Sequence, residues 1–267
     1  LLASINELAG SEANVATGYH AIEFLLWGQD LNGTGAGAGN RPYTDFVKGQ
    51  GCTNANCDRR AQFLQAAVDL LISDLDDMVG QWAPNDSQNY RATFLALQAD
   101  EAITRILYGM GSLSLGELAG ERMKVALEAN SPEDEHDCFS DNTHFSHFYN
   151  AKGVRNIYRG EYQRVDGSSV TGPSLSNLVS AKDVDADKKI QAQFAVTESK
   201  LQLIVDTAEN TIKPVKFDQM ISPGNTAGEK MIRDAISSLV DQTVLIESAA
   251  LTLGITNLNP DTADHTF

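Results

Sequence analysis

The stretch AQFLQAAVDLLISDLDDMV, residues 61–79, decides the fold class of this 267-residue chain. Its apolar residues recur at alternating steps of four and three, which draws one stripe along an α-helix. The stripe consists of Leu64, Val68, Leu71, Leu75 and Met78. We therefore predict a helix between Asp58 and Val79 that packs in a helical bundle.

The same spacing predicts further helices along the chain. Pro84 and the polar residues after it end the first helix, and a second is expected at about residues 87–108, antiparallel to the first. A third begins at Ser112 or Ser114 and reaches about Ala129. Two long helices follow, the first of which stops before Pro214; their stripes are Ile190, Phe194, Leu201, Ile204, Ala208 and Ile212, then Ile232, Ile236, Leu239, Ile246 and Ala250.

Strand patterns are scarce, so the predicted fold is all-α. Long helices with short turns are typical of up-and-down bundles, and we expect two of them packed together. The Gly-Met-Gly stretch that ends at Gly111 is the candidate junction. It gives an N-terminal bundle over residues 1–111 and a C-terminal bundle over residues 112–267.

Composition limits the partners of the protein. The chain has 20 Lys and Arg against 36 Asp and Glu, a formal charge of −16, which repels phosphate backbones and favours cations. Nucleic acid is therefore not an expected partner. The apolar runs fall short of the roughly 20 residues that a membrane-spanning helix needs, so no transmembrane segment is expected.

The cysteines and the first residue bear on the compartment. Cys52 and Cys57 lie in the polar loop GQGCTNANCD, which predicts a small disulfide loop formed in an oxidising compartment; free thiols are the alternative. The chain opens at Leu1 with no initiator Met. We expect that a signal segment has been removed upstream.

The segment GYHAIEFLLWGQD holds the first candidate site. On a helix, His20, Glu23 and Trp27 fall at i, i+3 and i+7 and share one face. Imidazole and carboxylate suit iron, zinc or manganese, and the pair can also pass a proton. The alternative is a simple hydrogen-bonded pair. The zinc-protease motif H-E-x-x-H is absent, which argues against a thermolysin-like mechanism.

The segment SLSLGELAGERMK holds the second. Ser114, Glu117 and Glu121 are expected on one helical face, with Arg122 to the side. Two carboxylates one turn apart repel each other, and this repulsion destabilises the helix unless another interaction compensates it. Solvent or salt bridges with Arg122 and Lys124 can compensate this repulsion, and so can a bound cation or a ligand carboxylate oriented by Arg122.

The third candidate segment, SPEDEHDCFSDNTHFSHFYN, contains three of the five histidines. Asp141 is placed to cap a helix that starts near Asn142, which would leave the histidines solvated. The competing interpretation is that His136, Asp141 or His144 completes a site with residues of other helices, which Cys138 would join in its reduced form. The density of histidine favours this second interpretation.

Together the three segments resemble the imelysin family. The family's G-x-H-x-x-E motif matches Gly18, His20 and Glu23, and the ELAGERM segment matches residues 117–123. EDEHDCFSDNTH looks like the corresponding loop of the family's iron-regulated branch. The resemblance implies two helical-bundle domains with a site at their interface, a signal peptide or lipoprotein anchor, and expression linked to iron.

The resemblance also implies a peptidase label and further helices before G-x-H-x-x-E, so the first bundle is expected to be incomplete. We expect a periplasmic or outer-membrane-associated protein of the bacterial envelope that binds a metal ion, iron or zinc, or a small ligand. His20 and Glu23 would be metal ligands or an acid/base pair. The expected ligand-binding residues are Trp27, Ser114, Glu117, Glu121, Arg122, Asp141 and His144.

Two alternatives remain open. In the first, the protein is a peptidase in which Glu23 activates a water, with or without a metal. In the second, it is a non-enzymatic module that recognises a partner protein or a haem group. Envelope proteins and the missing N-terminal segment are the expected macromolecular partners.

Overall fold

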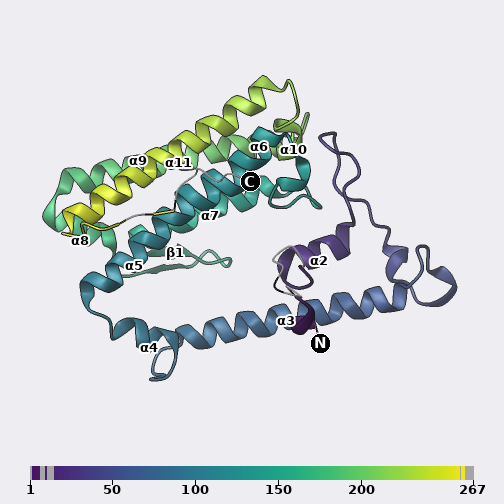
Figure 1. The fold of residues 1–267 in the computed structure, drawn as a ribbon, viewed down its shortest axis with the longest axis horizontal. Coiled ribbons are helices and arrows are strands. Elements are labelled where there is room, and N and C mark those ends of the chain that lie inside the picture. The colour runs from purple at the N-terminus through teal and green to yellow at the C-terminus, as the bar shows by residue number, and fades with distance from the viewer. Residues whose placement is uncertain (1, 7–9, 11–14, 259, 262–267) are drawn as a thin grey trace. The chain divides into compact units, whose positions relative to one another are not determined.

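The computed structural model describes residues 2–6, 10, 15–258 and 260–261 (Figure 1). Contacts between Cα atoms divide the chain into two compact units. The N-terminal unit contains residues 1–32 and 37–97, and the C-terminal unit contains residues 33–36 and 98–267. The predicted pair of bundles with a boundary at residue 111 stays a prediction.

The N-terminal unit is built on one long helix, α3 (Cys57–Trp82), which confirms the helix expected from residues 61–79. The shorter helix α2 (Gly18–Trp27) packs along it (Figure 1). The apolar stripe of α3 is only partly covered, since Leu75 and Met78 are exposed. The remaining elements are α1 (Leu2–Ile5), the 3₁₀ turns η2 (Tyr43–Phe46) and η3 (Gly49–Gly51), and α4 (Tyr90–Leu95).

In the C-terminal unit, the long helices α9 (Val184–Ala208) and α11 (Thr226–Thr252) lie side by side, with α7 (Thr143–Arg159) against α9 (Figure 1). The strands β1 (Glu161–Gln163) and β2 (Ser169–Thr171) form one antiparallel hairpin, with Glu161 opposite Thr171. The other elements are α5 (Ala99–Ser112), the π-helix η4 (Leu113–Val125), α6 (Ala126–Ala129), the 3₁₀ turn η5 (Pro132–Asp134), α8 (Leu175–Lys182) and α10 (Phe217–Met220).

Two apolar clusters fill this unit. One gathers Met123, Leu201, Phe217 and Leu239 from four different elements. The other contains Leu107, Tyr158, Phe194 and Ile246. Because helices supply almost all of this core and the two strands are short, the all-α prediction is confirmed.

The helix expected at residues 87–108 is two helices, which corrects the prediction. Asn89 caps α4 by accepting the backbone N–H of Ala92 at 3.0 Å, and α4 ends at Leu95. Gln98 has extended backbone angles, and α5 starts after it with Asp100 and Glu101 in its first turn, where carboxylates favour the helix dipole. Apolar residues occur on both sides of this break, so the apolar pattern alone did not locate it.

The glycines at the expected junction lie inside a continuous helical stretch, because α5 runs directly into η4. A Cβ atom at Gly111 would lie 2.7 Å from Cγ of Pro260. The glycine therefore lets the chain after α11 approach α5 closely, and it does not end a helix.

The helix expected to continue to Pro214 ends at Ala208, so Ile212 was wrongly placed in its core stripe and is 93% exposed. The Asn210 side chain accepts the backbone N–H groups of Ile212 and Lys213 at 3.0 and 2.9 Å. Such a local turn competes with helix continuation.

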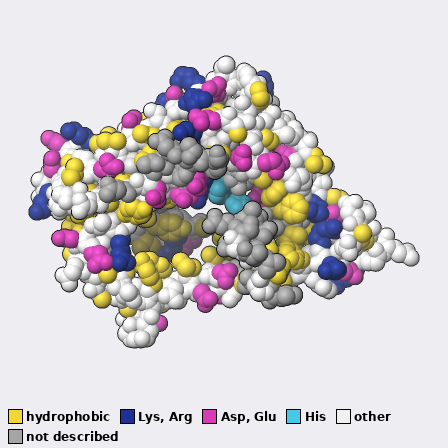
Figure 2. All heavy atoms as spheres, in the orientation of Figure 1, with side chains coloured by type: hydrophobic (Ala, Val, Ile, Leu, Met, Phe, Trp, Pro, Cys, Tyr) yellow, Lys and Arg dark blue, Asp and Glu magenta, His cyan; other side chains and the backbone are white. Residues whose placement is uncertain are grey.

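Acidic side chains are distributed over the visible face of the molecule and do not gather in one block (Figure 2). Among the described residues, no helix combines the length and the apolarity that spanning a membrane requires.

Candidate functional site

The first candidate, the His20–Glu23 pair, lies on α2 as predicted. Nδ1 of His20 and Oε2 of Glu23 are 2.8 Å apart, and the side chains are 41% and 10% exposed. Gly18 begins the helix with φ of 84°, in the left-handed region that favours glycine. The glycine of G-x-H-x-x-E thus has a backbone role, while the imidazole is reachable from solvent.

Arg41 holds the C-terminal end of α2. Its backbone N–H donates to the carbonyl of Trp27 at 2.8 Å, and its guanidinium donates to the carbonyl of Phe24 at 3.4 Å. The same guanidinium lies 5.5 Å from the centroid of the Phe24 ring. The Trp27 carbonyl is one that the helix end leaves without an intrahelical partner, whereas the Phe24 carbonyl also accepts the backbone N–H of Gly28 at 2.8 Å. Together these contacts anchor the end of the helix that carries His20 and Glu23.

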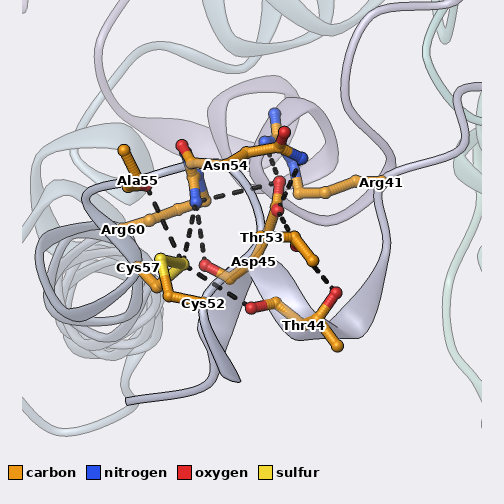
Figure 3. Close-up of a disulfide and its surroundings, with 9 residues drawn as sticks. All are labelled: Arg41, Thr44, Asp45, Cys52, Thr53, Asn54, Ala55, Cys57 and Arg60. Atoms are coloured by element: carbon orange, nitrogen blue, oxygen red, sulfur yellow. Dashed lines mark hydrogen bonds and ion pairs between the residues drawn. A yellow bond between two sulfur atoms is a disulfide. The ribbon is translucent and has the colours of Figure 1, made fainter. Parts of the chain in front are cut away.

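Arg41 is itself fixed by a buried carboxylate, that of Asp45 (Figure 3). Asp45 accepts hydrogen bonds from Asn54 at 2.7 Å, Thr53 at 2.9 Å and Arg41 at 3.1 Å. Burial raises the pKa of Asp45, but the hydrogen bonds and the charge of Arg60 outweigh it and hold this pKa below its usual value. An ionised Asp45 therefore links the loop to α2.

The predicted disulfide between Cys52 and Cys57 is present beside this network (Figure 3). It joins the turn after η3 to the first residue of α3. The bond therefore constrains the loop that supplies two of the donors to Asp45.

Trp27, expected to share the face of His20 and Glu23, ends α2 and is 40% exposed. Together with Arg41, Asp45 and Asn54 it lines a pocket of about 310 Å³. This pocket belongs to the loop after α2, and His20 and Glu23 are not among its lining residues.

The second segment is a π-helix, η4, and this changes which of its side chains meet. Arg122 donates to Oε2 of Glu117 at 3.3 Å across five residues, a spacing that suits the i→i+5 pattern of a π-helix. The expected common face of Ser114, Glu117 and Glu121 was therefore wrong: Ser114 is buried, Glu117 is half-buried and Glu121 is exposed. The expectation rested on an α-helical period.

Ser114 has a structural environment. Its hydroxyl donates to the carbonyl of Met110 at 2.8 Å and accepts the side-chain amide of Gln242 at 2.9 Å. These hydrogen bonds tie η4 to α11 inside the core and occupy the hydroxyl.

In the third segment, His144 is fully buried on α7. Its Nε2 lies 2.9 Å from Oε1 of Glu209, and Lys216 pairs with the same carboxylate. Burial lowers the pKa of His144, and the charge of Lys216 lowers it further. A neutral His144 thus joins α7 to the segment after α9.

Asp141 does not cap α7, which corrects that prediction. Asn142 occupies the N-cap position without a side-chain cap, and Asp141 precedes it with φ of 55°. This left-handed conformation, which Asp tolerates better than most residues, leaves the carboxylate buried beside two others. Carboxylate oxygens of Glu135, Asp141 and Asp218 lie within 4.8 Å of one another.

These three residues, Glu135, Asp141 and Asp218, define an acidic cluster, in which the pKa of Glu135 is strongly shifted. Burial, together with the charges of Asp218 and Asp141, raises the pKa of Glu135 to about 9. The Thr143 hydroxyl, which accepts the backbone N–H of Asp137 at 2.9 Å, opposes this rise. It lies outside hydrogen-bond geometry with either oxygen of Glu135.

His147 lies nearby on α7 and is fully buried. Its ring centroid is 4.9 Å from that of Phe217 and 6.3 Å from that of His136. Burial lowers the pKa of His147 to about 3, so the imidazole is neutral at physiological pH.

Sequence reasoning missed Glu135 and Asp218. Glu135 stands among other acidic residues in EDEHDCF, and Asp218 lies in a short segment far along the chain. Burial is the property that distinguishes them, and no local pattern encodes it. The predicted association of the second and third segments with His20 and Glu23 stays a prediction.

These features define a class of protein: an all-α chain with a His–Glu pair on one helix and a buried acidic loop beside another. The family model described as Imelysin matches residues 3–246, and the chain therefore belongs to the imelysin family. No curated protein matches the chain.

Proposed function

We propose that this imelysin-family protein binds a transition-metal ion, iron or zinc, through His20 and Glu23, and serves iron uptake or its regulation in the bacterial envelope. The observation that carries the proposal is the approach of Nδ1 of His20 to Oε2 of Glu23, at 2.8 Å. Imidazole nitrogen and carboxylate oxygen are ligands that both metals accept.

The exposure of the pair supports a binding role. The imidazole is 41% exposed and can be reached by an incoming ion, while the Glu23 carboxylate is only 10% exposed. A partly desolvated carboxylate attracts a cation more strongly than one in bulk water. Two protein ligands leave further coordination positions, and the formal charge of −16 favours the approach of cations.

The compartment is part of the proposal. The Cys52–Cys57 disulfide favours an oxidising environment such as the periplasm, because cytosolic thiols are kept reduced. A periplasmic or outer-membrane-associated location and a link to iron supply follow from the resemblance to the iron-regulated branch.

The test is calorimetry on the full chain after chelator treatment, with Zn²⁺ and, under anaerobic conditions, Fe²⁺. The double variant His20→Ala, Glu23→Ala should lose at least tenfold in affinity. Its matched control is Glu101→Ala, Arg105→Ala, which removes an exposed helical ion pair of 2.7 Å on α5. Unchanged affinity in the His20, Glu23 variant would remove the metal role.

The same protein also tests the peptidase alternative. Unfolded insulin chain is incubated with Zn²⁺-loaded wild type and with Glu23→Gln. Cleavage that disappears in the variant would favour a peptidase over a binding protein, whereas no cleavage by either leaves binding as the function.

A further inference from the structure

The acidic cluster brings together the loop between α6 and α7 and the short helix α10, which lies far along the chain. Glu135 follows η5, Asp141 precedes α7, and Asp218 is the second residue of α10. Their exposed fractions are 5%, 4% and 0%. Asn130 strengthens this arrangement, since its side chain donates to the carbonyl of Ile221 at 2.6 Å and ties the start of the loop to the end of α10.

Burial of these carboxylates has a large desolvation cost that hydrogen bonds do not offset at Glu135. Neither oxygen of Glu135 accepts a hydrogen bond from the described residues, although the side chain is directed into the cluster. Buried carboxylates are normally hydrogen-bonded, paired with a cation or bound to a metal. The charges of Asp218 and Asp141 act on Glu135 in the unfavourable sense. A positive charge among the three oxygens would reverse each of these effects.

We propose that Glu135, Asp141 and Asp218 bind a hard divalent cation such as Ca²⁺, at a second site that is distinct from His20 and Glu23. Ca²⁺ takes oxygen ligands at about 2.3–2.6 Å, so two oxygens on opposite sides of the ion lie roughly 5 Å apart and neighbouring oxygens lie closer. Three oxygens within 4.8 Å of one another match this spacing.

The ligand type separates this site from the transition-metal site. Carboxylate oxygens suit Ca²⁺, Mg²⁺ and Mn²⁺, whereas imidazole nitrogen suits zinc and iron. Three carboxylates supply three of the six to eight oxygens that Ca²⁺ takes, and water or backbone carbonyls complete the set. Bound there, the ion links the loop of residues 135–141 to α10.

The experiment uses the full chain, treated with a chelator and desalted, with CaCl₂ titrated by calorimetry and thermal unfolding followed by circular dichroism. We expect wild type to bind Ca²⁺ and its Tm to rise with Ca²⁺ concentration, because an ion that binds only the folded state stabilises it. Glu135→Gln and Asp218→Asn should each lose at least tenfold in affinity and lose the rise in Tm.

Two controls make the outcomes separable. Asp134→Asn removes an exposed carboxylate directly before Glu135 and should bind Ca²⁺ like wild type. The His20→Ala, Glu23→Ala variant should also keep Ca²⁺ binding, and Glu135→Gln should keep Zn²⁺ binding, so failure of one site does not imply failure of the other. Circular dichroism verifies folding, and Glu135→Gln keeps the shape of the side chain while removing the carboxyl group that ionises to bind the cation.

Three results would overturn the proposal. Wild type could show neither binding heat nor a shift in Tm with Ca²⁺. Folded Glu135→Gln and Asp218→Asn could both bind as tightly as wild type. Ca²⁺ binding could vanish in the His20, Glu23 variant and persist in Glu135→Gln, which would assign the ion to the other pair.

Discussion

The His20–Glu23 pair and the acidic cluster differ in how the chain builds them. The pair comes from one turn of α2, is partly exposed, and its two side chains contact each other at 2.8 Å. The cluster takes Glu135 and Asp141 from a loop and Asp218 from α10, and all three are buried. A local site can be reached and exchanged without unfolding, whereas a buried tertiary site stabilises the fold only when its charges are compensated.

The largest effect should come from the apolar support of the cluster. Phe217 is fully buried next to Asp218, and its ring packs against that of His147 with centroids 4.9 Å apart. Phe217→Ala should therefore lower the free energy of unfolding by about 3–5 kcal/mol. The counterpart beside the pair is Phe24→Ala, which removes a ring that is 39% exposed and should have a smaller effect. Chemical denaturation measures the free energy of unfolding of both variants. Equal losses in the two variants would contradict the expected difference between the acidic cluster and the His20–Glu23 pair.

The next effect is a pH dependence in the metal-free protein. The folded-state pKa of Glu135 is raised to about 9 from 4.5 by burial, with Asp218, Asp141 and Asp137 adding to the rise. Between these values the folded state binds more protons than the unfolded state, so stability falls as pH rises. From pH 7 to 9 we expect a loss of roughly 2 kcal/mol, since one pH unit corresponds to at most about 1.4 kcal/mol.

His147 does not contribute to the loss of stability between pH 7 and 9. Its pKa is lowered to about 3, so it removes stability only as pH falls below the unfolded value of 6.5. Denaturation curves in a chelator at several pH values test the prediction. Glu135→Gln should reduce the loss of unfolding free energy between pH 7 and 9. Saturating Ca²⁺ should reduce the same loss in wild type. An unchanged slope in Glu135→Gln would show that another group causes the loss.

An effect of similar size is expected on the side of the pair, from the Cys52–Cys57 disulfide. The bond closes a short loop with a sequence separation of 5, for which the chain-entropy model gives roughly 2 kcal/mol. Cys52→Ser, Cys57→Ser should lower the free energy of unfolding by this amount, measured by chemical denaturation, and leave Ca²⁺ affinity unchanged. A loss of Ca²⁺ affinity in that variant would show that the disulfide loop and the acidic cluster are energetically coupled, which contradicts two independent sites.

The contrast also explains how much could be predicted from sequence. The helix α3 and the contact of His20 with Glu23 follow from short-range periodicity, which the residues themselves encode. A salt bridge to Arg122 was one of the expected alternatives, and Glu117 makes it. The expected common face with Ser114 was wrong because η4 is a π-helix, whose period differs from the α-helical one that was assumed. Asp218 was missed because only the packing of α10 brings it to Glu135, and no local pattern records that proximity.

The smallest effect on stability should come from His20→Ala. The pair is a single helical contact with a 41% exposed imidazole, and such pairs contribute less than about 0.5 kcal/mol. The variant should therefore unfold like wild type in a metal-free buffer, within about 0.5 kcal/mol, while Zn²⁺ no longer raises its Tm. This separation distinguishes a binding residue from a structural one. If His20→Ala lowered stability by several kcal/mol without metal, the pair would be part of the scaffold, and the contrast with the acidic cluster would fail.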